Sequence, residues 1–262
     1  MATNQWQDNL VKAQSFLYTE HADTVMVGSS LSARIIKDSI PTVSSISFGG
    51  CSVEDGLMIV QAKKQKPQYI LVETNYFLRV GNPELVNDVT KGVIPEVKKF
   101  IPSLREQNEP ICLVSGLLIH AIGLNPQAAA ASVDMNFLSK SINDKIKSDS
   151  LASNRFISQR MHILLPLFKQ LERQGINFIF FEMPVNPKLT NLSTHRQTRQ
   201  LVNKLFPKAS YAYLPFDNAC YVTTDGEHLN LNDQYRFSHF FKLALQTSMK
   251  ISTFQGEAPS SL

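Results

Sequence analysis

Two segments near opposite ends of the chain carry the residue types of nucleophilic catalysis. In "TVMVGSSLSARI" (24–35), an apolar run breaks at Gly28 and Ser29, so Ser30 stands where a strand turns into a helix. In "TTDGEHLN" (223–230), two residues separate Asp225 from His228. In a turn, this spacing brings the carboxylate to one imidazole nitrogen while the other nitrogen points outward. Ser30, His228 and Asp225 could therefore serve as nucleophile, base and orienting acid in acyl transfer.

Two further segments could stabilise the oxyanion of such a reaction. In "SISFGGCSVEDGL", an expected strand ends at Phe48, and a glycine beyond it lets the backbone approach a ligand and present an N–H. Of Gly49 and Gly50, we favour Gly50, because it directly precedes Cys51 and the next helix. In "ILVETNYF", Asn75 follows a third strand and offers a side-chain amide. With the N–H of Ser30, three donors would come from three strand ends.

These four segments, in this order, resemble the SGNH (GDSL-like) hydrolase superfamily over roughly residues 22–245. The blocks stand here as Gly28-Ser29-Ser30-Leu31, Gly49-Gly50, Glu73-Thr74-Asn75 and Asp225-Gly226-Glu227-His228. The resemblance implies a catalytic triad of Ser30, Asp225 and His228. It also implies an oxyanion hole formed by Ser30, Gly50 and Asn75. No metal or organic cofactor is needed for this chemistry.

The sequence departs from the superfamily pattern at two blocks. Ser29 replaces the Asp of Gly-Asp-Ser, as in a Gly-Ser-Ser branch with bacterial cell-envelope and polysaccharide-modifying members. In the third block, Glu73 and Tyr76 replace the usual Gly and Asp around Asn75. The resemblance implies a serine-dependent ester hydrolase or O-acyl(acetyl)transferase. Its substrate would be a small-molecule or glycan acyl ester.

Other interpretations of the same residues remain open. Ser30 could be only a helix N-cap, and Ser29, Ser32 and Ser52 are rival hydroxyls. Cys51 is a conceivable nucleophile. "GSSLSAR" could bind a phosphate or nucleotide at a helix N-terminus, although neither nucleotide-binding glycine pattern is present. A catalytically inactive descendant that binds a glycan or a partner protein is the main alternative function.

The elements that must position these residues alternate between strands and helices. Strands are expected at Thr24–Val27, Val43–Phe48, Tyr69–Glu73, Asn177–Glu182 and Tyr211–Phe216. Helices are expected at Ser52–Lys64, at Pro83–Leu104 with a break at Pro95, and at Asn232–Met249, and a further helix should end at Gly175. This alternation predicts a three-layer α/β/α fold with a flavodoxin-like parallel sheet of about five strands. Ligands of such sheets bind beyond the carboxyl ends of the strands, where the four blocks lie.

We expect one domain over residues 1–250 and a disordered tail over 251–262. Residues 110–155 interrupt the strand–helix rhythm. They could form an insertion or lid over the site, or an ordinary extra helix pair.

Composition excludes several classes of protein. A net charge of +4 over 262 residues, with acids interleaved among the bases, does not favour nucleic-acid binding. The longest apolar run, 111–124, is too short to span a membrane. Three widely spaced cysteines favour neither a disulfide framework nor zinc. The polar N-terminus lacks a signal-peptide core, so we expect a cytoplasmic location, or the cell envelope if a leader is missing. The sequence gives no oligomeric state.

Overall fold

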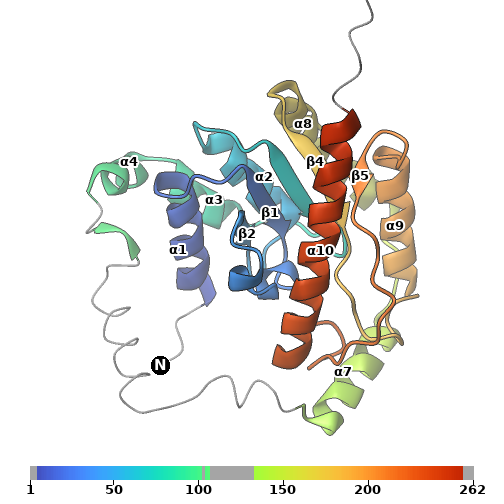
Figure 1. Cartoon of the computed structure of the whole chain (residues 1–262). Helices are drawn as coiled ribbons and strands as arrows, with labels where there is room; N and C mark the ends of the chain where they lie inside the picture. Colours follow the sequence, from blue (N-terminus) through green and yellow to red (C-terminus); the bar gives the residue numbers. More distant parts are fainter. Residues whose placement is uncertain (1–4, 102–103, 107–132, 256–262) are drawn as a thin grey trace, which may run out of the picture.

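The computed structural model describes residues 5–101, 104–106 and 133–255. Within them, five parallel strands form one sheet in the order β2-β1-β3-β4-β5 (Figure 1). The strands are β1 (Thr24–Gly28), β2 (Val43–Ser47), β3 (Tyr69–Glu73), β4 (Asn177–Phe181) and β5 (Ala212–Tyr213). This order confirms the predicted flavodoxin-like α/β/α fold. It also places the switch in strand order between β1 and β3, where such sheets bind ligands.

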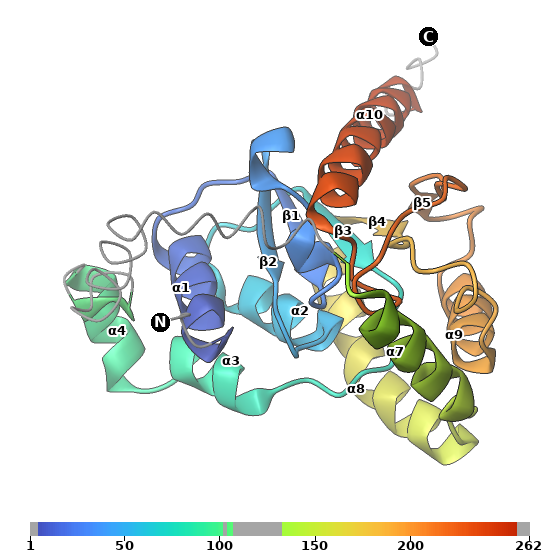
Figure 2. The same cartoon turned by 90° about the horizontal axis from the view of Figure 1, so that it is seen from below.

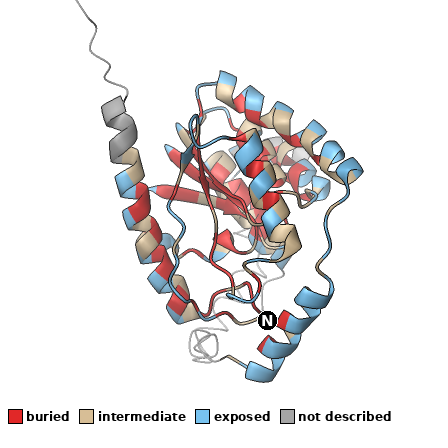
Figure 3. Ribbon diagram, turned by 90° about the vertical axis from the view of Figure 1, so that its right-hand side faces the viewer, coloured by how far each residue is buried: buried red, intermediate tan, exposed pale blue. Residues whose placement is uncertain are grey.

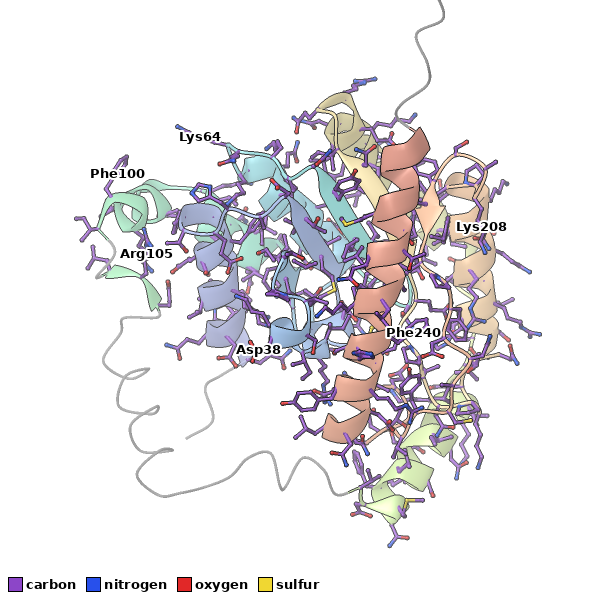
Figure 4. All side chains as sticks on the ribbon, viewed as in Figure 1. Asp38, Lys64, Phe100, Arg105, Lys208 and Phe240 are labelled. Carbon is purple, nitrogen blue, oxygen red and sulfur yellow. The ribbon has the colours of Figure 1, made fainter. Side chains whose placement is uncertain are left out.

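Helices cover both faces of the sheet (Figure 2). One face carries α1 (Gln5–Tyr18), α2 (Val53–Ala62), α3 (Pro83–Thr90), α8 (Asn154–Arg173) and α9 (Ser193–Leu205). The other carries α7 (Met135–Lys147), α10 (Leu231–Gln255) and the 3₁₀ helices η1 (Ser32–Arg34) and η2 (Lys37–Ser39). Phe240 belongs to α10, which lies in front of the sheet in Figure 4. Phe100, the last residue of α4 (Val93–Phe100), lies at the outer side of the molecule, beyond α1 (Figure 4).

Successive side chains of the buried strands point alternately into two hydrophobic cores, one on each face of the sheet. Val25 and Val27 pack into the core beneath α1, α2 and α8, while Met26 points into the core beneath α10. In β4, Phe178 and Phe180 face the first core, and Ile179 and Phe181 face the second. Figure 3 shows the buried residues gathered in the sheet and on the inner sides of the helices. Continuous apolar strands are typical of a parallel sheet that is covered on both faces.

The predicted strands agree with the structure to within two residues at most ends, but two helix predictions were wrong. After Ser30 the chain forms only η1 and η2, so no α-helix begins there. The helix expected over 83–104 is two helices, α3 and α4, which break at Gly92 rather than at Pro95. Gly92 has a φ of +90° and caps α4, whereas Pro95 lies in the first turn of α4, where its missing N–H removes no hydrogen bond.

Other boundaries refine the prediction. Helix α1 was not predicted, and α10 continues six residues beyond Met249 to Gln255. Gly175, with a φ of +81°, ends α8 as expected. Of the predicted insertion at 110–155, residues 110–132 lie outside the described residues. The part that is described forms α7 and the start of α8. Of the predicted disordered tail at 251–262, residues 251–255 instead belong to α10, and residues 256–262 lie outside the described residues. No helix within the described residues is long and apolar enough to cross a membrane.

Two adjacent residues of α8 can test which of its side chains pack into the core between this helix and the sheet. Leu164 is fully buried, whereas Ile163 keeps 44% of its surface exposed. Leu164→Ala should lower the free energy of unfolding by about 2–5 kcal/mol, because it leaves a cavity beneath the sheet. Ile163→Ala should change it by less than about 1 kcal/mol. Guanidinium titrations of both variants provide the measurement, and equal losses would contradict this packing.

Candidate active site

A chain of hydrogen bonds joins Ser30, His228 and Asp225 at the carboxyl end of the sheet. The Oγ of Ser30 lies 2.9 Å from Nε2 of His228, although 198 positions separate the two residues in sequence. On the other side of the ring, Nδ1 of His228 lies 2.7 Å from Oδ2 of Asp225. The carboxylate accepts a hydrogen bond from the N–H at Nδ1, so the lone pair of Nε2 is free to accept a hydrogen bond from the serine hydroxyl.

The loop that carries Asp225 and His228 is a narrow turn with fixed geometry. Thr223 and Leu229 form an antiparallel bridge across its base. Gly226, at its tip, has a φ of +97°, which a residue with a side chain rarely adopts. The other carboxylate oxygen of Asp225 accepts the backbone N–H groups of Glu227 and His228, at 3.0 and 2.8 Å. The Asp-x-x-His spacing therefore lets one carboxylate bind both the backbone of the turn and the imidazole.

These hydrogen bonds keep Asp225 ionised. Partial burial by itself would raise the pKa of its carboxyl. The hydrogen bonds from the His228 ring and from the backbone N–H groups of His228 and Glu227 outweigh burial and hold the pKa well below its usual range. Asp225 therefore stays ionised near neutral pH, and its negative charge can stabilise a protonated His228.

Neighbouring elements fix this loop from outside. Ser141 of α7 donates a hydrogen bond of 2.8 Å to the carbonyl of Asp225, and Lys145 of α7 forms an ion pair with Glu227. The N–H of Asn186, in the segment after β4, donates to the carbonyl of Gly226 at 2.8 Å. Within the region 110–155, helix α7 therefore buttresses the acid–histidine loop.

Backbone donors lie at the ends of β1 and β2, which run side by side. Gly50 has a φ of +74°, and the N–H of Cys51 donates to the carbonyl of Phe48 at 3.3 Å, as in a type II turn. The N–H of Gly49 is already donated to Asn9 Oδ1 at 3.2 Å. The N–H groups of Ser30 and Gly50 have no acceptor within residues 5–101, 104–106 and 133–255. Of the two glycines, Gly50 is thus the one that can donate to a ligand.

Asn75 forms a reciprocal pair with the backbone after β4. Its amide donates to the carbonyl of Met183 at 2.9 Å and accepts the N–H of Met183 at 2.7 Å. An amide nitrogen carries two hydrogens, so one donor remains after this pairing. The pairing also fixes which end of the side chain is the nitrogen. Asn75 is thus oriented, half-buried, two residues beyond β3.

Glu73, the last residue of β3, anchors the turn that carries Ser30. Its side chain is fully buried and accepts hydrogen bonds from the N–H and Oγ of Ser29, the latter at 2.7 Å. It also accepts the N–H and Oγ of Ser32, at 3.1 and 2.5 Å. Four donors from one turn converge on a single carboxylate, so the backbone on both sides of Ser30 is fixed while its own Oγ stays free for His228.

A glycine at position 28 makes this contact possible. A Cβ there would lie 2.6 Å from the Glu73 carboxylate and 2.2 Å from Ser32 Oγ, closer than atoms can approach. The buried residues Gly28, Ser29, Ser32 and Glu73 form one unit, which we call the carboxylate anchor.

The carboxylate anchor bears on two of the open interpretations. The hydroxyl that accepts a backbone N–H in this turn belongs to Ser29, at 3.1 Å from the nitrogen of Leu31. Ser30 makes no such capping bond, so the N-cap interpretation of Ser30 was wrong. The N–H groups of Ser29 and Ser32, which a phosphate would need, are donated to Glu73. An internal carboxylate therefore occupies the anion position of this turn.

The remaining rival nucleophiles are committed or unreactive. Ser52 bonds Asp55 at the start of α2, where both side chains are buried. Burial, with Asp55 nearby, raises the pKa of the Cys51 thiol to about 12, so the reactive thiolate is scarce near neutral pH. No group of three or more metal-binding side chains is present in the part of the chain that the structure describes.

A cavity of about 1430 Å³ runs along β4 and β5, away from this site. Neither Ser30 nor His228 lines it. Its charged residues Glu182 and Arg199 satisfy each other in a two-pronged ion pair, with nitrogen–oxygen distances of 2.6–3.0 Å. Glu172 and Lys208 also line the cavity: Glu172 accepts a hydrogen bond of 2.7 Å from the hydroxyl of Tyr211, and the ammonium of Lys208 lies 5.4 Å from the ring centre of Tyr213. The residues that line this cavity therefore do not include the hydrogen-bonded Ser30, His228 and Asp225.

Sequence reasoning missed the role of Glu73, which it noted only as a departure from the resemblance. One signal was available, because a glutamate that ends an apolar strand becomes buried and must then find several donors. The contributions of α7 and of the segment around Asn186 had no comparable signal.

A scan against models of known protein families and a search of characterised proteins both gave no match to this chain. The fold and the hydrogen-bonded residues Ser30, His228 and Asp225 are therefore the basis for interpreting its function.

Substitution of Glu73 tests the carboxylate anchor. Glu73→Gln keeps the size of the side chain but places an NH₂ group among four donors, so at least one buried donor loses its acceptor. We expect the free energy of unfolding to fall by about 2 kcal/mol or more. Glu84→Gln, at an exposed position of α3, should cost less than about 1 kcal/mol. Chemical denaturation measures both variants, and equal stability would show that Glu73 does not hold the turn.

Proposed function

We propose that this protein is a serine-dependent esterase or O-acyltransferase of the SGNH type. The observation that carries the proposal is the continuous hydrogen-bonded chain from Ser30 through His228 to Asp225. The ordered sequence blocks and the flavodoxin-like sheet order support it.

Each residue has a defined part in the first half of the reaction. His228 accepts the proton of the Ser30 hydroxyl at Nε2 as Oγ attacks the acyl carbon. The carbonyl oxygen becomes an oxyanion, and the N–H groups of Ser30 and Gly50 and the remaining amide hydrogen of Asn75 are the available donors. Asp225 stabilises the imidazolium that forms. The tetrahedral intermediate then collapses, and the leaving alkoxide takes the proton from His228, which leaves an acyl group on Ser30.

The second half repeats these steps with a different nucleophile. His228 removes a proton from water or from an acceptor hydroxyl, which attacks the acyl-enzyme and releases Ser30. Water gives hydrolysis, and a sugar hydroxyl gives transfer. The resemblance to polysaccharide-modifying proteins supports a small acyl group, such as acetyl, on a glycan hydroxyl as the substrate. No step in this sequence calls for a metal or an organic cofactor.

A fluorophosphonate probe tests whether Ser30 is activated. Wild-type protein should gain the mass of one adduct, because the probe reacts with a serine whose proton has an acceptor. Ser30→Ala should gain none, and His228→Ala should react about 10²- to 10⁴-fold more slowly. Intact-mass spectrometry over time gives these rates. Ser210→Ala, at an exposed serine, should react like the wild type. A folded wild-type protein without an adduct would favour the inactive binding protein instead.

The role of Asn75 can be separated from that of the triad. Asn75→Ala should lower kcat for 4-nitrophenyl acetate about 10²- to 10³-fold with little change in KM, because it removes an oxyanion donor. Its stability must be measured in parallel, since the pair with Met183 is also lost. Asn203→Ala, an exposed amide on α9, is the matched control. An unchanged kcat would remove Asn75 from the oxyanion hole.

A further inference from the structure

An arginine that has no carboxylate partner among the described residues lies beside the proposed oxyanion hole. The guanidinium carbon of Arg79 stacks 3.7 Å from the ring centre of Tyr76. Its one hydrogen bond, from Nη1 to the carbonyl of Cys51, is long at 3.5 Å. No carboxylate lies within ion-pair distance of Arg79 among the described residues. Of its five N–H groups, four thus have no protein acceptor in that part of the chain.

Two other arginines that are buried or half-buried, Arg160 and Arg199, differ from Arg79 because each has a carboxylate partner. Arg160 pairs with Glu54 at 2.6 Å, and Arg199 pairs with Glu182 at 2.6 Å. Two carboxylates of α2, close to the segment that carries Arg79, are already bound elsewhere. Glu54 binds Arg160 and the N–H of Gly81, and Asp55 binds Ser52 and the N–H of Asn82.

Contacts place the Arg79–Tyr76 pair at the reactive residues. Tyr76 directly follows Asn75, and Arg79 touches Cys51, which directly follows Gly50. Tyr76 also lies near enough to Glu227, the neighbour of His228, for that carboxylate to act on its phenol. Burial and this carboxylate raise the pKa of Tyr76, which stays a neutral phenol. The pair thus spans from the oxyanion donors to the acid–histidine loop.

The backbone segment that carries Arg79 is held by hydrogen bonds to residues of α8 and α2. Arg160, buried in α8, donates to the carbonyl of Leu78 at 3.1 Å and to that of Arg79 at 2.7 Å. Glu54 and Asp55 of α2 accept hydrogen bonds from the N–H groups of Gly81 and Asn82, respectively. A held segment that presents a stacked guanidinium, with no carboxylate partner among the described residues, is preorganised to bind an anion through two oxygens.

We propose that Arg79, supported by the ring of Tyr76, binds an anionic group of the ester that Ser30 attacks, either a carboxylate or a phosphate. This inference rests on the proposed function and narrows its substrate class from acyl esters in general to negatively charged ones. Arg79 is a specificity residue here and takes no part in the bond changes. The fork of its guanidinium can donate hydrogen bonds to two oxygens of either anion.

The test compares charged and neutral forms of the same ester. O-acetylated oligogalacturonate is set against its methyl-esterified, neutral form, and acetylated glucose 6-phosphate against acetylated glucose. Release of acetate gives kcat and KM for the wild type, Arg79→Gln and Arg173→Gln. Arg173 is an exposed arginine at the end of α8, on the side of the sheet opposite to the site.

We expect the wild type and Arg173→Gln to have a KM about 10- to 100-fold lower for the charged member of at least one pair. Arg79→Gln should abolish this difference by raising the KM of the charged ester to that of its neutral counterpart. Arg79→Lys, which keeps the charge but loses the planar stack, should restore part of it. The pair that shows the effect identifies carboxylate or phosphate.

Two results would overturn the proposal. One is a wild type with no preference in either pair, and the other is an Arg79→Gln variant that loses charged and neutral esters equally. If the wild type neither cleaves any ester nor takes a fluorophosphonate, the proposed function fails. Calorimetry with the unacetylated oligogalacturonate and glucose 6-phosphate then tests Arg79 independently. Binding that Arg79→Gln abolishes would support an anion site, and absence of binding would overturn it.

Discussion

The geometry of the site depends on one buried carboxylate. Glu73 ends the central strand β3 and binds the turn after β1 through four donated hydrogen bonds. Because the strand itself is fixed by its pairing with β1 and β4, this contact transfers the rigidity of the sheet to the turn. Ser30 needs no strained backbone to present its hydroxyl, since no residue other than glycine in the described parts has a positive φ.

Sheet order explains how residues from four distant segments meet. β1 lies between β2 and β3, so the turns that carry Ser30, Gly50 and Asn75 leave the same edge side by side. The acid–histidine loop has no strand of its own at that point. It is instead closed by its own bridge and held by α7 and by the segment after β4. Side-chain and backbone hydrogen bonds replace strand pairing where the sheet ends.

The sequence predicted the parts of this arrangement that follow from local patterns. Apolar runs located the strands, and Gly175 marked the end of α8. Ser30, Asp225 and His228 were named from residue type and spacing. The failures have non-local causes. A helix was expected after Ser30, but the chain there forms only η1 and η2, and the N–H groups of Ser29 and Ser32 are held by Glu73, which lies 41 to 44 positions later. Arg79 could not be identified as a candidate anion-binding residue from the sequence, because the sequence does not show which arginines have a carboxylate partner.

The two departures from the superfamily pattern are interdependent. An aspartate at position 29 would replace the hydroxyl that lies 2.7 Å from Glu73, so two carboxylates would face each other in a buried site without a proton between them. Serine at 29 and glutamate at 73 instead form a donor–acceptor pair, and Gly28 provides the space for it. The acidic residue that holds this turn therefore lies on β3 rather than next to Ser30 in sequence. Near the same site, the guanidinium of Arg79 stacks on the ring of Tyr76 and has no carboxylate partner among the described residues.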